Sequence, residues 1–148
     1  MPEVLAALDF SDVAAPVLDT GAELATALGA RLHLLHVAAE EPELAGYDKD
    51  DVATFTRDDR ARQLLDEHHD LRARADELTA GGLEVVPLLV MGSTVEVILD
   101  QARRLDAAYI VAGTHGHGGL HHLLLGSVSE GLLKRADRPV VLVPVDRR

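Results

Sequence analysis

The chain alternates between short continuous apolar runs and longer segments in which apolar residues recur every three or four positions. A short continuous run is typical of a strand buried on both faces, and the spacing of three and four is typical of a helix with one apolar face. The predicted strands are residues 4–8, 32–37, 83–90, 107–112 and 139–145. The predicted helices are residues 14–28, 61–78, 93–105 and 127–136. This alternation predicts an α/β fold, a single-domain open twisted parallel five-stranded sheet with helices on both faces, over residues 1–148.

Glycine, serine and proline mark the ends of these elements. Gly29 and Gly81 follow predicted helices and suit their C-terminal ends. Ser93 and Ser127 each stand three residues before a glutamate, which is the capping-box pattern, so we expect each serine to cap a helix. Pro87 cannot donate a hydrogen bond to a sheet ladder, so its strand should lie at or near a sheet edge.

Three histidines fall inside predicted elements. His68 lies on the apolar stripe of its helix and is expected to be packed, while His33 and His36 lie in the second strand and are expected to be neutral, hydrogen-bonded side chains. Residues 38–56 are acidic and have no apolar periodicity, which predicts a long loop. Loops of that length inside a compact domain are often functional or mobile.

Composition narrows the class of protein. Hydrophobic residues make up 47% of the 148 residues, which suits a packed globule, and the chain has no cysteine for a disulfide or a thiolate metal site. The net charge is -11, and no basic patch points to nucleic acid or to a membrane surface. The first residues lack a signal-peptide pattern, and no apolar run approaches the ~20 residues of a spanning helix. We therefore expect a cytoplasmic protein that binds neither nucleic acid nor a membrane.

The richest candidate site is a glycine-rich segment after the fourth predicted strand. Residues 113–119 read Gly-Thr-His-Gly-His-Gly-Gly, and Gly126 immediately precedes the last predicted helix. Backbone N–H groups of a glycine-rich turn can form an anion site, and the N-terminus of a helix offers a second one. No lysine or arginine occurs between Arg104 and Lys134, so this is not a Walker-type loop. Two such anion sites, one on each side of the largely apolar residues 120–125, suit the binding of a polyphosphate.

The same segment contains a cluster of histidines, namely His115, His117, His121 and His122. Zinc sites usually take three or four ligands, and the chain has no cysteine to complete such a set. We therefore expect no metal site here, and interpret these side chains as phosphate contacts or solvated loop residues. No Ser-His-Asp arrangement or carboxylate pair in the sequence predicts a catalytic residue.

Three stretches together resemble the universal stress protein family. The spacing Gly113-x2-Gly116-x9-Gly126-Ser127 is similar to the ATP-binding pattern of that family. The opening Leu8-Asp9-Phe10-Ser11 and the tail segments 124–129 and 138–144 also resemble it. The resemblance covers essentially the whole chain and implies a Rossmann-like, adenine-nucleotide-binding fold. One departure is Ala7, which stands where many members carry a proline, although the contact expected there is through the backbone.

This resemblance implies roles for individual residues in an ATP site. Asp9 would accept hydrogen bonds from the ribose hydroxyls, although its place after a strand also suits a plain helix cap. The backbone around the adenine would come from Ala7 and Val37, with Gly92 bordering the base side of the cleft. The triphosphate would be lined by Ala112, Gly113 and Gly116. The phosphates would be bound through N–H and hydroxyl groups of Gly126, Ser127, Val128 and Ser129.

The implied function is an ATP-binding regulatory module of the stress response, with Mg²⁺ as an accompanying ion and an unidentified regulatory protein partner. The resemblance also implies a homodimer formed through the last strand, Val140 to Val143. A slow ATP hydrolase is the alternative, although the sequence offers little cationic stabilisation for phosphoryl transfer.

The sequence leaves open whether the bound nucleotide is ATP or AMP. A response-regulator domain is excluded because the acidic residue after the third strand and the lysine after the fifth are missing, and the few aromatic residues disfavour a flavin.

Overall fold

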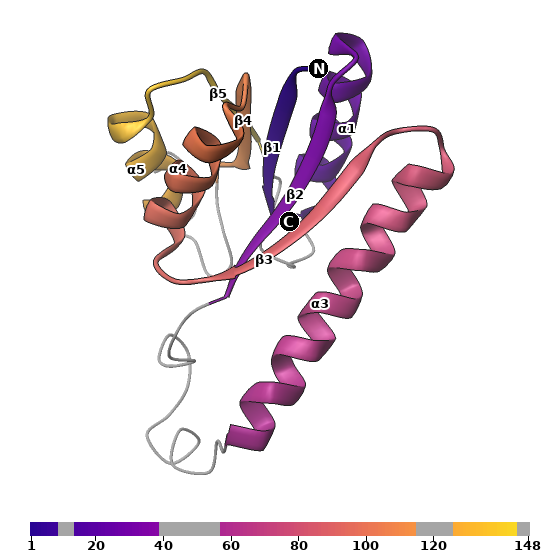
Figure 1. The fold of residues 1–148 in the computed structure, drawn as a ribbon. Helices are drawn as coiled ribbons and strands as arrows, with labels where there is room; N and C mark the ends of the chain where they lie inside the picture. The colour runs from indigo at the N-terminus through magenta and orange to yellow at the C-terminus, as the bar shows by residue number, and fades with distance from the viewer. Residues whose placement is uncertain (9–13, 39–56, 115–125, 145–148) are drawn as a thin grey trace.

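Five parallel strands form one sheet at the centre of the computed structural model (Figure 1). The structure describes residues 1–8, 14–38, 57–114 and 126–144. The strands are β1 Glu3–Leu8, β2 Arg31–Ala38, β3 Val85–Met91, β4 Tyr109–Gly113 and β5 Val140–Val143. Their order across the sheet is β3-β2-β1-β4-β5, and every neighbouring pair is parallel. The predicted fold class is therefore confirmed, and Pro87 lies in the edge strand β3 as expected.

Helices cover both faces of this sheet. They are α1 Ala14–Leu28, α3 Arg57–Ala80, α4 Thr94–Leu105 and α5 Ser127–Arg135. Helices α1 and α3 pack on one face, and α4 and α5 pack on the other (Figure 1). Among the described residues, no helix is long and apolar enough to span a lipid bilayer.

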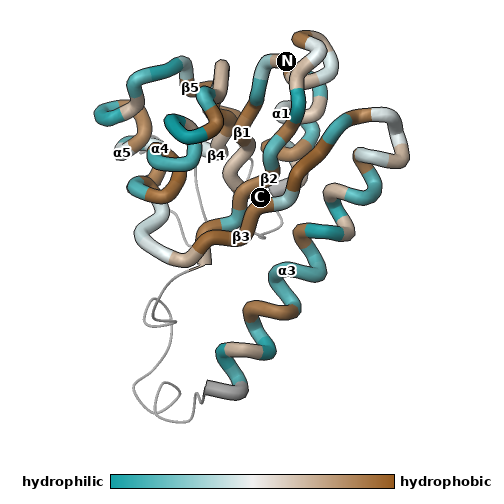
Figure 2. The backbone as a smooth tube through the Cα atoms, viewed as in Figure 1, coloured by the Kyte–Doolittle hydropathy of each residue, from teal (hydrophilic) through white to brown (hydrophobic). Residues whose placement is uncertain are grey.

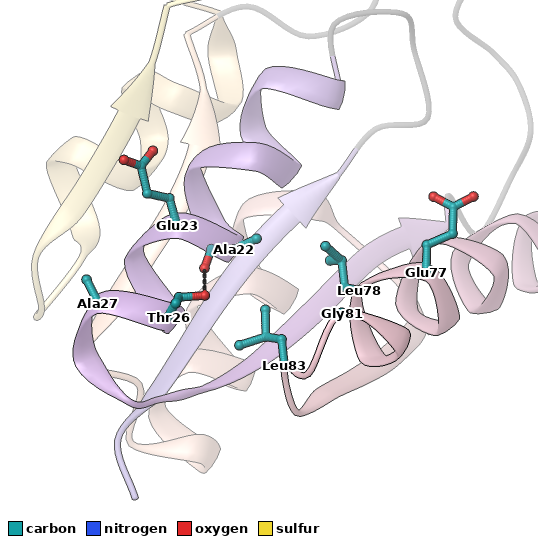
Figure 3. A pocket seen from close by; sticks show the side chains of 8 residues that line it. All are labelled: Ala22, Glu23, Thr26, Ala27, Glu77, Leu78, Gly81 and Leu83. Carbon is teal, nitrogen blue, oxygen red and sulfur yellow. Dashed lines mark hydrogen bonds between the residues drawn. The ribbon is translucent and has the colours of Figure 1, made fainter.

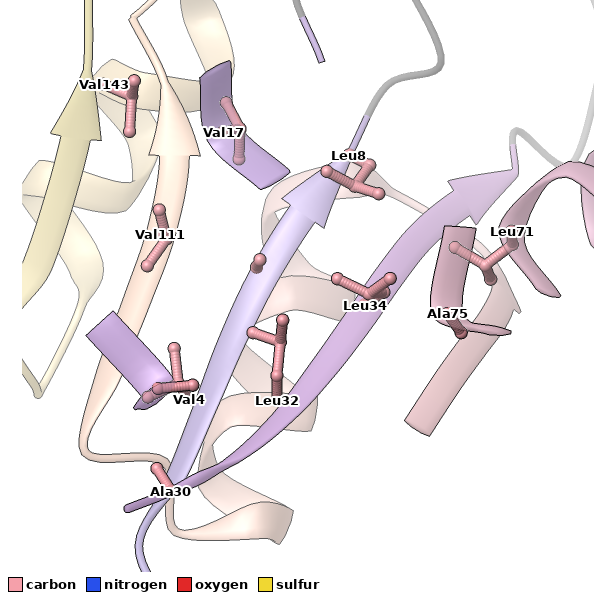
Figure 4. Packing of buried hydrophobic residues seen from close by; sticks show 12 residues of the cluster. Val4, Leu8, Val17, Ala30, Leu32, Leu34, Leu71, Ala75, Val111 and Val143 are labelled. Carbon is pink, nitrogen blue, oxygen red and sulfur yellow. The ribbon is translucent and has the colours of Figure 1, made fainter. Parts of the chain in front are cut away.

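Each face of the sheet has its own apolar core. On the α1/α3 face, β1 contributes Val4, Ala6 and Leu8 (Figure 4), and on the α4/α5 face it contributes Leu5 and Ala7. Successive strand residues point to opposite faces, so a strand covered on both sides must be apolar at every position. Figure 2 shows this as hydrophobic colouring along the central strands and mostly hydrophilic colouring along α3. The continuous apolar runs of the sequence follow directly from this two-sided burial.

The two capping-box predictions are wrong in their hydrogen bonds. Ser93 is the N-cap residue of α4, but its side chain makes no capping hydrogen bond. It is exposed, and water can satisfy the first N–H groups of a helix. The N-cap residue of α5 is Gly126, so Ser127 already lies inside the helix. The entry to α5 is set by backbone, because the Gly126 N–H donates to the Thr114 carbonyl at 2.8 Å.

The prediction that His68 is packed is also wrong, because its side chain is exposed. Helix α3 has 24 residues and is about 36 Å long, whereas the 7 residues of β3 span only about 23 Å. The N-terminal part of α3 therefore runs past the sheet (Figure 1). Only the later part of its apolar stripe, from Leu71 through Ala75, is fully buried. The predicted loop lies outside the described residues apart from its first residue, Ala38, which ends β2.

Candidate functional site

The candidate site lies where β1 and β4 part at their carboxyl ends, and we call this place the crevice. The pairing of β1 with β4 stops at Ala6–Val111, whereas its pairing with β2 continues to Leu8–His36. The two strands therefore separate before either of them ends. The chain also reverses direction across the sheet here, since β2 and β3 lie on one side of β1 and β4 and β5 lie on the other. Open α/β sheets bind their ligands at such a switch point.

Four of the residues expected in the site lie together on the α4/α5 side of this crevice. Ala7, Val37, Ala112 and Val128 belong to one apolar cluster, although they come from three different strands and a helix. Ala112 is buried, and the other three are half-buried. Partly exposed apolar side chains of this kind suit the face of a planar ring.

Gly92 lies in the turn between the end of β3 and the start of α4. Its N–H donates to the Ala38 carbonyl at 3.0 Å, which holds the turn beside Val37. Its φ angle is 146°, a conformation that side chains rarely adopt. A Cβ atom added here would lie 2.8 Å from Cγ2 of Val97. Both observations explain why a glycine is needed at this border of the crevice.

A set of hydrogen bonds, which we call the carbonyl clamp, joins the end of β4 to the start of α5. The Ser129 hydroxyl lies 2.7 Å from the Gly113 carbonyl and 3.0 Å from the Thr114 carbonyl, and donates to them. Ser129 is only 2% exposed. The Thr114 carbonyl also accepts the Gly126 N–H at 2.8 Å, and the Thr114 N–H donates to Val143. The clamp thus brings Gly113, Gly126 and Ser129 together at the crevice.

The N-terminus of α5 supplies hydrogen-bond donors at the same place. The first helical bond of α5 runs from the Glu130 N–H to the Gly126 carbonyl, and the N-cap residue Gly126 has no side chain to cap the helix. The N–H groups of Ser127, Val128 and Ser129 come before that first bond. Unpaired N–H groups and the positive end of the helix dipole favour an anion. Ser127 is exposed, so its hydroxyl can add a further contact, whereas the Ser129 hydroxyl proton is already used in the clamp.

The remaining expected site residues lie outside the described part of the chain. These are Asp9 and Gly116, together with the histidines at 115, 117, 121 and 122. Within the residues that are described, no group of three or more His, Asp or Glu side chains is arranged to hold a metal ion. The described part of the crevice therefore offers methyl groups, backbone N–H groups and hydroxyls, which suit binding of an apolar ring and an anion.

Two close contacts near the site could not be predicted from the sequence. A Cβ atom on Gly131 would lie 2.9 Å from Cγ2 of Val95, so this glycine lets α5 pack closely against α4. His36, expected only to be hydrogen-bonded, lies 3.1 Å through Nδ1 from the Leu8 carbonyl at the rim of the crevice. A glycine within a helix and a histidine within a strand are visible in the sequence, but their partners depend on the fold.

A polar cluster lies at the opposite, amino end of the strands. His33 Nε2 lies 2.6 Å from the Glu3 carboxylate, while its buried Nδ1 has no hydrogen-bond partner among the described residues. The expectation for His33 is therefore met at one ring nitrogen only. Arg31 donates to Glu84 and Glu3, and the pKa of Arg31 is raised, first by the hydrogen bond to Glu84. These contacts tie β1, β2 and the approach to β3 together, away from the crevice.

A surface depression lies between α1 and the end of α3 (Figure 3). Its lining is Ala22, Glu23, Thr26, Ala27, Glu77, Leu78, Gly81 and Leu83. The Thr26 hydroxyl donates to the Ala22 carbonyl of its own helix at 2.8 Å and is thus already used. The depression is at the amino ends of the strands, so it is separate from the crevice.

Known proteins with similar sequences span the whole chain. A universal stress protein of Thermus aquaticus is 35% identical over 140 residues, which covers 95% of this chain and 96% of that protein. MJ0577 of Methanocaldococcus jannaschii is 27% identical over 152 residues, covering 95% of this chain and 93% of that protein. The solved structure of MJ0577 superposes with a TM-score of 0.81 at 26% identity and covers 99% of this chain and 98% of its own.

A more distant structure carries a nucleotide. The universal stress protein of Archaeoglobus fulgidus in complex with dAMP has a TM-score of 0.62 at 24% identity and covers 97% of both chains. At that identity the likeness shows a shared fold. The model of the universal stress protein family matches residues 1–144, nearly the full length. The chain therefore belongs to the universal stress protein family.

Proposed function

We propose that this protein binds ATP in the crevice between β1 and β4 and acts as a nucleotide-dependent regulatory module of the stress response. The observation that carries the proposal is the N-terminus of α5, which begins at a glycine N-cap and is held by the carbonyl clamp beside the apolar cluster of Ala7, Val37, Ala112 and Val128. In this cluster Ala7 and Val37 suit the adenine ring, and the helix N-terminus, with Ala112 and Val128 beside it, suits phosphate. Both ends of an adenine nucleotide thus have a complementary surface in one crevice.

The phosphates would contact backbone groups more than side-chain charges. We assign the N–H groups of Ser127, Val128 and Ser129 and the Ser127 hydroxyl to this contact, with Gly113 and Gly116 lining the path of the triphosphate. Asp9 follows β1 directly and would accept from the ribose hydroxyls. A chain with a net charge of -11 repels ATP at long range, so Mg²⁺ bound to the phosphates would reduce that repulsion. The complex of the Archaeoglobus protein with dAMP adds support for an adenine nucleotide.

Titration calorimetry with ATP, ADP and AMP, with and without Mg²⁺, tests this proposal on protein first shown to be free of nucleotide. The informative variant is Ser127→Glu, because a carboxylate in the first turn favours the helix but repels phosphate. We expect ATP affinity to fall by at least about tenfold, which corresponds to ~1.4 kcal/mol. Leu133→Glu adds the same charge at an exposed position later in α5 and should change the affinity little.

Two outcomes would reject the proposal. Folded, nucleotide-free wild-type protein that fails to bind any of the three nucleotides would rule out this ligand class. Equal ATP affinity for wild type and Ser127→Glu would mean that the phosphates do not bind at the N-terminus of α5. Preference for AMP over ATP would keep the crevice as the site but change the ligand.

We also propose that the protein forms a homodimer through β5, which is an edge strand of the sheet. The Ile110 N–H donates to Pro139 and the Thr114 N–H donates to Val143, so residues 139, 141 and 143 face β4. The N–H of Val140 therefore points out from the edge and can pair with a second copy. Val140→Pro removes that donor without breaking the ladder to β4. Sedimentation should then show a monomer, and a dimer that survives would exclude this interface.

A further inference from the structure

The depression between α1 and the end of α3 has no part in the proposed function, because it lies at the other end of the strands from the crevice. Its volume is about 500 Å³. The apolar part of its lining is Ala22, Ala27, Leu78 and Leu83 (Figure 3). The Thr26 hydroxyl also lines it but donates to its own helix. The floor of the depression therefore offers apolar contacts to a ligand.

Both helices end beside the depression in the same hydrogen-bonded motif. In α3 the Leu83 N–H donates to the Leu78 carbonyl, and the Gly82 N–H donates to the Thr79 carbonyl. This is a Schellman motif, in which the residue after the turn packs back on the last turn of the helix. Helix α1 ends in the same way, with a φ of 64° at Gly29. The depression is thus formed between two well-defined helix ends.

Two carboxylates flank this apolar floor. Glu23 comes from α1 and Glu77 from α3, and both side chains are exposed. Figure 3 shows them on either side of Leu78 and Leu83. Within the described part of the chain, neither carboxylate makes an ion pair or a hydrogen bond. Both charges are therefore available to a ligand that lies on the floor.

The two helix ends add negative potential at the same place. The C-terminal end of a helix carries a partial negative charge, which a lysine or arginine in the last turn can offset. Helices α4 and α5 have Arg103, Arg104, Lys134 and Arg135 in their last turns. In contrast, α1 and α3 have no basic residue in their last turns. The depression thus combines an apolar floor with negative charge that neither helix end offsets.

We propose that this depression is a docking surface for a basic segment of a partner protein. An apolar side chain of that segment fills the hollow, and arginine or lysine residues on either side of it pair with Glu23 and Glu77. Charge complementarity carries the choice of partner. A second copy of this chain fits poorly, because each copy has a net charge of -11. Small-molecule sites enclose most of their ligand, whereas this depression is open, which suits a segment presented by a protein.

The probe for this surface is the peptide acetyl-Arg-Leu-Leu-Arg-amide, added to the full chain without nucleotide. An ¹H–¹⁵N NMR titration gives both the affinity and the residues that the peptide contacts. We expect the largest shift changes at residues that line the depression, such as Thr26, Leu78 and Leu83. The peptides acetyl-Arg-Ser-Ser-Arg-amide and acetyl-Glu-Leu-Leu-Glu-amide each lack one half of the complementarity and should bind at least about threefold more weakly.

Two pairs of matched variants separate this surface from the overall charge of the protein. Glu23→Gln with Glu77→Gln should weaken the peptide at least about threefold. Asp66→Asn with Asp70→Asn removes the same charge from exposed positions of α3 outside the depression and should change the affinity little.

The second pair adds a positive charge. Ala27→Lys places an ammonium group at the depression, where it also favours the end of α1, and should block the peptide in a folded protein. Leu133→Lys adds the same charge at an exposed position of α5 and should leave binding intact.

Three results would overturn the proposal. Equal weakening by the two double variants would mean that the net charge of the protein attracts the peptide without a site. Absence of binding, or shift changes confined to other surfaces, would exclude the depression. Spermine that binds at the same residues at least as tightly as the peptide would assign the depression to a small organic cation in place of a protein segment.

Discussion

Replacing Ser129 by alanine tests whether the carbonyl clamp stabilises the end of β4. The hydroxyl has one proton, which it shares between the carbonyls of Gly113 and Thr114 at 2.7 and 3.0 Å. Thr114 keeps a second donor in the Gly126 N–H, but Gly113 lies beyond the last pair between β1 and β4. The variant therefore leaves one partly buried carbonyl without this donor, which costs about 1–3 kcal/mol of unfolding free energy.

The assay is urea denaturation of ligand-free protein, supported by a thermal melt. For a chain of this size, a loss of about 2 kcal/mol lowers Tm by roughly 4–8 °C. Ser127→Ala is the matched control, because Ser127 lies in the same turn but is exposed, and it should stay within about 0.5 kcal/mol of wild type. Ser129→Thr keeps a hydroxyl and should recover part of the loss.

Either of two results would refute this account of the clamp. An unfolding free energy of Ser129→Ala equal to that of wild type would mean that water or a shifted backbone satisfies the Gly113 carbonyl. An equal loss for Ser127→Ala would mean that the effect comes from helix propensity in the first turn and not from the clamp.

Three further substitutions test other parts of the structure. Gly92→Ala should cost about 1–3 kcal/mol because of its φ of 146°, and an unchanged urea midpoint would contradict that strain. Leu132→Ala should cost about 2–5 kcal/mol, since Leu132 is fully buried, while exposed Leu133→Ala should cost under about 0.5 kcal/mol; equal losses would contradict the packing of α5. A hydrogen bond from Arg138 lowers the pKa of Asp137, so this carboxylate favours folding above its unfolded pKa and loses that effect as pH falls through the folded value. Arg138→Ala should raise the pKa of Asp137 in an NMR titration, and an unchanged value would exclude the contact.

The sequence predicted the sheet well because each strand is buried on both faces. Such a strand has few polar positions to interrupt its apolar run, with His33 and His36 of β2 as buried exceptions, so its limits are visible to within a few residues. Pro87 correctly indicated an edge strand, and Gly29 correctly marked the end of α1, where its φ is 64°. Both are local effects of backbone geometry, which a sequence can report.

The errors share a different cause, because they depend on contacts between distant segments. His68 has the right spacing to be packed, but the helix is longer than the strand it covers. The serine of the second capping box is displaced because Gly126 bonds to Thr114, and Ser129 turns back to the same strand end. Neither the relative length of two elements nor a contact between them can be read from local sequence.

The candidate site also has one part that residue types predict and another that depends on contacts between distant segments. The glycine-rich segment and the helix after it were predicted from residue types, whereas the roles of Ala7, Val37 and Ala112 came only from the resemblance to a family. The structure places those three residues in one cluster with Val128. Ala7, Val37 and Ala112 are ordinary strand residues, so only the register between strands could distinguish them from the rest of the core.

The opening of the crevice has a physical cost that two buried side chains offset. The pairs between β1 and β4 stop at Ala6–Val111, so Leu8 and Gly113 lie beyond the part of the two strands that is paired. Leu8, at the end of β1, accepts from His36, and Gly113, at the end of β4, accepts from Ser129. Both donors are buried, and they come from different elements on opposite faces of the sheet. Both strand ends are therefore hydrogen-bonded by buried side chains, and a site that is ordered before binding loses less entropy when its ligand binds.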